Sequence, residues 1–114
     1  MSEDPTLLLK KSLVEGSPHI NALSLLASNG EPIAYVPENY PIFSEIDIYV
    51  RILRTLHESM PKFHQVDITL SDNRHIIILR TTGNKYIVCK TQQNPNLGRI
   101  YLVLRSLAYR LGGT

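Results

Sequence analysis

Residues 41–60 read PIFSEIDIYVRILRTLHESM, and this stretch decides the fold. At about 100° per residue it forms a helix with one apolar stripe of the kind that packs on a core, made of Ile42, Ile46, Tyr49, Leu53, Leu56 and Met60. Four further apolar residues flank the stripe, Ile48 and Ile52 on one side and Phe43 and Val50 on the other. They widen the apolar arc to roughly 220°, whereas about 100° is the usual requirement. The helix is therefore expected to contact something besides its own core.

Two elements are predicted before this helix. Asp4 followed by Pro5 is typical of a helix start, and leucines at helical spacing continue this first helix to Gly16. Apolar runs on both sides of Asn29-Gly30 predict a β-hairpin over residues 19–36, because this dipeptide tolerates the positive φ values of a tight turn.

Three strands and a helix are predicted after it. Residues 63–71 alternate between apolar and polar, as an edge strand does, and residues 85–91 complete a meander. Residues 75–81 are rich in β-branched side chains and do not alternate, which predicts a central strand covered on both faces. Apolar residues at helical spacing over residues 97–111 predict a final helix that ends at Gly112-Gly113.

The resulting order is α-β-β-α-β-β-β-α, which places the chain in the α+β class. A central strand covered on both faces needs helices on both sides of a five-stranded antiparallel sheet. We expect the first and last helices on one face and the long helix alone on the other, in one domain spanning residues 1–114.

The composition argues against several classes of protein. The net charge is only +2 and 19% of the residues are charged, which disfavours nucleic-acid binding. The single cysteine, Cys89, cannot form an internal disulfide, and no apolar leader opens the chain, so a cytoplasmic protein is expected. No apolar run approaches the roughly 18 residues of a spanning helix, so we expect no direct membrane insertion.

The residues also disfavour catalysis and cofactors. None of the four histidines, His19, His57, His64 and His75, has a metal-ligand spacing. The sequence contains neither a GxSxG nucleophile elbow nor a GxxxxGK[ST] phosphate loop. We therefore predict a protein that is not an enzyme and needs no cofactor.

Arg51 and Arg54 allow two interpretations. An arginine supplied in trans can stabilise a phosphate during its transfer on a bound GTPase. However, Asp47 precedes Arg51 by four residues and Glu58 follows Arg54 by four, the spacing of exposed ion pairs on a helix. The ion pairs are the interpretation that we favour.

The order of elements, the hairpin that turns at SNGE, the solitary long helix and a closing helix that begins NLGRIYLVLR together resemble the Roadblock family, named after a dynein light chain. The resemblance covers residues 4–111, and the longin and profilin-like folds share much of the plan. It implies a non-enzymatic module that pairs through its solitary helix and edge strand, as a homodimer or as a heterodimer with a related Roadblock chain. Family members bind Ras-like small GTPases as scaffolds or regulators, and others are dynein adaptors.

On this sequence the implied interface combines exposed positions of the long helix with the strand over residues 63–71. Its expected members are Phe43, Asp47, Ile48, Val50, Arg51, Ile52, Arg54, Thr55, Val66 and Ile68. Two alternatives remain: a domain whose sheet and long helix enclose a small molecule, and a dynein-type adaptor light chain. The apolar run over residues 76–79 argues for a filled core and against the enclosed ligand.

Overall fold

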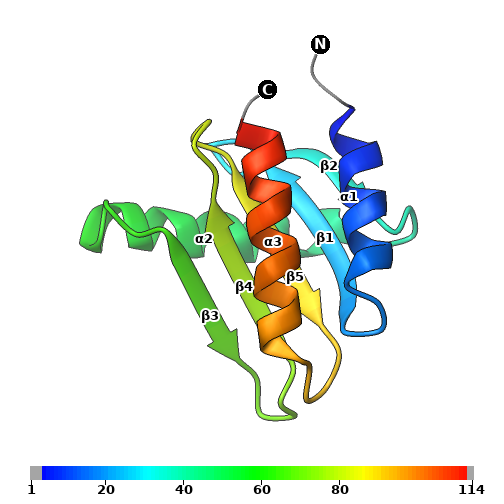
Figure 1. The fold of residues 1–114 in the computed structure, drawn as a ribbon. Coiled ribbons are helices and arrows are strands. Elements are labelled where there is room, and N and C mark those ends of the chain that lie inside the picture. Colours follow the sequence, from blue (N-terminus) through cyan, green and yellow to red (C-terminus); the bar gives the residue numbers. More distant parts are fainter. Residues whose placement is uncertain (1–3, 113–114) are drawn as a thin grey trace.

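The computed structural model describes residues 4–112, and over that range three helices and one five-stranded antiparallel sheet follow in the predicted order (Figure 1). The elements are α1 (Pro5–Glu15), β1 (Ile20–Leu26), β2 (Pro32–Val36), α2 (Ile42–Ser59), β3 (Gln65–Thr69), β4 (His75–Arg80), β5 (Tyr86–Thr91) and α3 (Leu97–Gly112). The predicted α+β class is confirmed. The last helix is predicted to end at Gly112-Gly113. Gly112 is its final helical residue, and Gly113 lies outside the described residues.

Local signals set the start of α1 and the hairpin turn. Asp4 caps α1 by accepting a hydrogen bond from the Thr6 N–H over 3.0 Å, and Pro5 opens the helix. In the turn between β1 and β2, Gly30 has a φ of 93°, so the positive φ falls on the glycine and not on Asn29. A Cβ on Gly30 would lie 2.5 Å from Val50 Cγ2, so the turn packs directly against α2.

The strand order is β2-β1-β5-β4-β3, which corrects one prediction. The strand predicted as central, β4, lies second from the edge and its end residues are half-buried. The middle strand is β5, all of which is buried except the half-buried Lys90. The β-branched run over residues 76–79 indicated cover on both faces but could not fix the order, because the chain turns after β4 and inserts β5 between β4 and β1.

The helices cover the two faces of the sheet as predicted. Figure 1 shows α1 and α3 side by side in front of the sheet and α2 crossing behind it. Leu8 and Leu9 of α1 join Ile100, Leu104 and Leu107 of α3 in one buried cluster. The second cluster lies on the other face and includes, from α2, Ile42, Tyr49 and Leu53.

The predicted stripe of α2 is largely confirmed. Ile42, Tyr49, Leu53 and Leu56 are buried and Ile46 is half-buried. Met60 was wrongly included, since it is 60% exposed. The helix ends at Ser59, and the backbone of Met60 has already left the helical region with a φ of −142°. No helix within residues 4–112 is long and apolar enough to cross a membrane.

Candidate functional site

The structure separates the two apolar flanks of α2. Ile48 is 57% exposed, and Ile52, on the same flank, is half-buried in the cluster that also contains Val66 and Ile76. Because Val50 on the opposite flank packs on the turn at Gly30, this flank lies on the side of α2 away from the β1–β2 hairpin. Ile52 of this flank and Val66 of β3 both border the second core cluster.

The other flank of α2 points toward the β1–β2 hairpin. Phe43 is 70% exposed, yet its ring meets Tyr35 of β2 edge to face, with the ring centroids 6.0 Å apart. Val50 is half-buried and packs on the turn at Gly30. The chain itself thus supplies part of the second contact that the wide apolar arc predicted.

The outer edge of β3 has backbone groups available for pairing. The Arg80 N–H donates to the His64 carbonyl and the Leu70 N–H donates to the Arg74 carbonyl, each over 2.8 Å. Because the bonds of an antiparallel pair alternate, the even-numbered residues of this strand bond to β4. The N–H and C=O groups of the odd-numbered residues, Asp67 among them, point away from the sheet.

Asp67 anchors β3 from the side opposite α2. Its carboxylate accepts a hydrogen bond of 2.7 Å from the Tyr101 hydroxyl of α3 and lies 2.7 Å from His75 Nδ1. Burial and this carboxylate both raise the pKa of Tyr101. With Asp67 held on the α3 side, the alternation turns Val66 and Ile68 toward α2, and the sequence predicted that these two residues share one face of the strand.

A polar network that sequence reasoning missed fixes α2 on the sheet. Glu45 accepts hydrogen bonds from Tyr40, from Tyr49 over 3.1 Å and from the Lys90 ammonium of β5 over 2.7 Å. Burial acts to raise the pKa of Glu45, but the bonds from Lys90 and the tyrosines outweigh it and the pKa is lowered. Burial raises the pKa of Tyr49 to about 12. The spacing of Glu45 and Tyr49 by four residues was the available signal.

The outer face of α2 does not form the predicted ion pairs. Asp47, Arg51, Arg54 and Glu58 are exposed, and no carboxylate in residues 4–112 lies within 4.0 Å of either arginine. Exposed pairs of this kind stabilise by only about 0.3–0.5 kcal/mol, too little to hold two long side chains together. The ion-pair interpretation is therefore wrong, and these charges face solvent beside Thr55.

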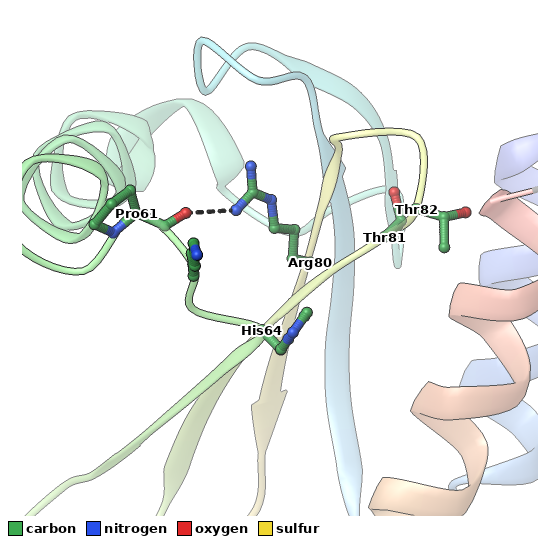
Figure 2. Close-up of a pocket in the computed structure, with 6 residues that line it drawn as sticks. Pro61, His64, Arg80, Thr81 and Thr82 are labelled. Atoms are coloured by element: carbon green, nitrogen blue, oxygen red, sulfur yellow. Dashed lines mark hydrogen bonds between the residues drawn. The ribbon is translucent and has the colours of Figure 1, made fainter.

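A basic pocket of about 410 Å³ opens at the start of β3 (Figure 2). It is lined by Pro61, Lys62, His64, Arg80, Thr81 and Thr82. Arg80 donates to the Pro61 carbonyl over 2.9 Å and to Asn84 Oδ1 over 2.8 Å. The pocket lies at the sheet edge and not between α2 and the sheet, where buried side chains pack, so it does not match the enclosed-ligand alternative. Residues 4–112 contain no cluster of three side chains suited to a metal ion.

No protein-family model matches the sequence, and no curated protein matches it. Solved structures match its fold. The gliding protein MglB from Thermus thermophilus has a TM-score of 0.80 at 12% identity, over 99% of this chain and 92% of that chain. A Roadblock/LC7 domain from Streptomyces avermitilis has a TM-score of 0.75 at 13% identity, over 96% and 95%. An MglB with a tetrameric arrangement has a TM-score of 0.76 at 12% identity, over 99% and 91%. The chain therefore has the Roadblock fold that its sequence resembles.

Proposed function

We propose that the chain is a non-enzymatic scaffold or regulator that pairs through β3 and the Ile48 flank of α2 and that binds a Ras-like small GTPase. Two observations carry the pairing: Ile48 is an exposed apolar residue on one flank of α2, and β3 is an edge strand whose Val66 borders the same core cluster as Ile52 of that flank. The tetrameric arrangement of one MglB supports self-association. The GTPase partner is implied by the resemblance to the Roadblock family.

The backbone of β3 allows a specific register for pairing with a second copy. In an antiparallel pair centred on Ile68, Asp67 of one copy lies opposite Thr69 of the other. By symmetry, Thr69 of the first copy lies opposite Asp67 of the second. Both residues point their N–H and C=O groups outward, so each such pair makes two hydrogen bonds. The two Ile68 residues then face each other on the α2 side, as a non-hydrogen-bonded pair.

The side chains favour this register over its neighbours. Centred on Ile68, the register sets Val66 opposite Leu70 and His64 opposite Asp72, an apolar pair and an imidazole–carboxylate pair. Centring on Asp67 would place two carboxylates directly opposite each other, which is unfavourable. Centring on Val66 would place Ile68 opposite His64. Of these three registers, only the one centred on Ile68 avoids facing carboxylates and places no apolar residue opposite His64.

Cysteine cross-linking tests this pairing. Directly opposite residues of a non-hydrogen-bonded pair have Cα atoms about 4.5 Å apart, within the range of a disulfide. Ile68→Cys should therefore give a disulfide-linked dimer on oxidation, seen by non-reducing electrophoresis. The native Cys89 is fully buried and should not compete. The matched control is Ile33→Cys, 44% exposed on the opposite edge strand, which should remain monomeric on the gel.

No cross-link from Ile68→Cys, or equal cross-linking from Ile33→Cys, would refute pairing through β3. The GTPase partner needs its own test. Calorimetric titration of the protein with a panel of Ras-like GTPases, each loaded with GDP or a non-hydrolysable GTP analogue, should identify a partner bound in one nucleotide state. If no GTPase in the panel binds in either nucleotide state, the proposed GTPase-binding function is refuted, whatever the result of the cross-linking.

A further inference from the structure

Charge is distributed unevenly along this chain. All ten acidic residues lie before position 73, together with five basic residues. Residues 73–114 contain no acidic residue and seven basic ones, Arg74, Arg80, Lys85, Lys90, Arg99, Arg105 and Arg110. The net charge of +2 does not reveal this asymmetry. Where the fold places the seven basic residues decides whether they form a positively charged surface.

The fold presents the last three of these arginines on the outside of α3. Arg99, Arg105 and Arg110 are exposed, and none has a carboxylate within 4.0 Å in residues 4–112. By contrast, Lys90 pairs with Glu45. The outer face of α3 is thus a positively charged surface without compensating carboxylates on its own helix.

Large apolar side chains stand out from the same face. Leu102 is 71% exposed and Tyr109 is 86% exposed, and a spacing of seven residues places them on one line along the helix. Neither contributes to the core cluster beneath α3, which uses Ile100, Leu104 and Leu107. These two side chains are therefore free to contact something outside the chain.

Helix α1 extends this surface. It lies beside α3 (Figure 1), and the Arg99 guanidinium joins the two helices by donating to the Glu15 carbonyl over 2.8 Å. Its outward residues repeat the pattern of α3: Val14 is 74% exposed, Leu7 is 47% exposed, and Lys10 and Lys11 are also exposed. We call this surface the α1–α3 face, defined by Leu7, Lys10, Lys11, Val14, Arg99, Leu102, Arg105, Tyr109 and Arg110.

We infer that the α1–α3 face docks on an anionic phospholipid surface. Basic side chains combined with leucine and an interfacial tyrosine are the composition of peripheral membrane-binding helices. The apolar side chains project singly from two convex helices, which suits a fluid lipid surface that adapts around each of them. A folded acidic protein would need a matching cavity for each one. Contact by this face requires no spanning helix.

Charge elsewhere in the chain supports one orientation on such a surface. Glu15 and Glu38 lie at the rim of the face, where Glu38 lines a groove with Lys10 and Val14. Since the segment before position 73 carries ten acidic against five basic residues, an anionic surface attracts α3 and repels much of the remainder. The α1–α3 face should therefore turn toward the lipid.

Vesicle co-sedimentation tests the inference with the full chain. The protein should sediment with vesicles of phosphatidylcholine mixed with phosphatidylserine, should not sediment with phosphatidylcholine alone, and should be released by high salt. Arg105→Glu with Arg110→Glu should weaken the partition by about thirtyfold or more, since each basic residue near an anionic surface contributes about a factor of five. Leu102→Ser with Tyr109→Ser should weaken it without changing the charge.

The matched control is Lys62→Glu with Arg74→Glu, which makes the same change of charge outside the α1–α3 face. It should reduce the partition far less than the α3 pair does. Circular dichroism and thermal unfolding confirm that each variant is folded, and Arg99 is left unchanged because it joins α1 to α3. Equal losses from the two charge-reversed pairs would overturn the inference, because binding would then follow net charge alone. The inference would also be overturned if the wild-type protein did not bind the vesicles but bound a glutamate-rich peptide through Arg105 and Arg110. That result would indicate an acidic protein partner.

Discussion

Replacing Ile48 by aspartate tests which flank of α2 forms the interface. Ile48 is 57% exposed, so in the monomer the new carboxylate stays in water. Substitutions at such exposed positions usually change the free energy of unfolding by less than about 0.5 kcal/mol. The isolated Ile48→Asp chain should therefore fold with nearly the wild-type stability.

In the dimer the same change is far more costly. Fully burying an isoleucine side chain contributes about 1.5–3 kcal/mol, and since 57% of Ile48 is still exposed, pairing gains about 1 kcal/mol from it. An unpaired carboxylate in the buried interface costs at least about 3 kcal/mol more. A two-fold interface contains the change twice, which gives a total of about 8 kcal/mol. That equals the whole standard free energy of a dimer with a micromolar Kd.

Light scattering coupled to size exclusion, with sedimentation velocity at several concentrations, measures this loss. Phe43→Asp is the matched control, since Phe43 is 70% exposed on the opposite flank and should leave pairing intact. An Ile48→Asp dimer as stable as the wild type would refute the assignment of the flank, as would dissociation caused by Phe43→Asp instead. An Ile48→Asp chain that fails to fold would place that side chain in the core.

Three further predictions follow from single residues. Gly30→Ala should lower the free energy of unfolding, measured in urea, by about 1–3 kcal/mol, because Gly30 has a φ of 93°. Gly83→Ala should lower it less, because the atom nearest to its new Cβ, Thr81 Oγ1, would be 3.8 Å away. Because the folded-state pKa of Glu45 is below its ordinary value of 4.5, its contribution to stability is present above that pH and is lost as the pH falls through the folded-state pKa. Glu45→Gln should therefore flatten the acid end of the stability profile, measured by thermal unfolding. Burial raises the pKa of the Cys89 thiol to about 12, so a thiol reagent at neutral pH should react slowly with folded protein and quickly in urea.

The sequence predicted those elements whose signals are local. A cap such as Asp4, a glycine with positive φ such as Gly30 and apolar periodicity all act over a few residues, and the structure confirms each of them. The position of β5 in the middle of the sheet depends on pairing with β1, at least sixty residues away. Alternation and β-branching indicate how well a strand is covered, and they carry no information about which strand lies beside it.

The candidate site shows the same division. Periodicity identified both apolar flanks of α2, but the direction in which α2 crosses the sheet decides that Phe43 and Val50 contact the β1–β2 hairpin while Ile48 lies on the other side of the helix. The polar contacts that orient these elements join distant residues, Glu45 with Lys90 and Asp67 with Tyr101. No spacing in the sequence pairs such residues, because each contact exists only after the sheet has formed.

The proposed pairing and the proposed lipid contact reinforce each other through symmetry. Two β3 strands join antiparallel within one continuous sheet only when the two-fold axis is perpendicular to that sheet. Because α1 and α3 cover the face opposite α2, this axis leaves both α1–α3 faces on the same side of the dimer. A dimer would then present ten lysines and arginines to one plane, where a monomer presents five. Once the first face is bound, the second meets the lipid at a high effective concentration, so vesicle binding should increase with the dimer fraction.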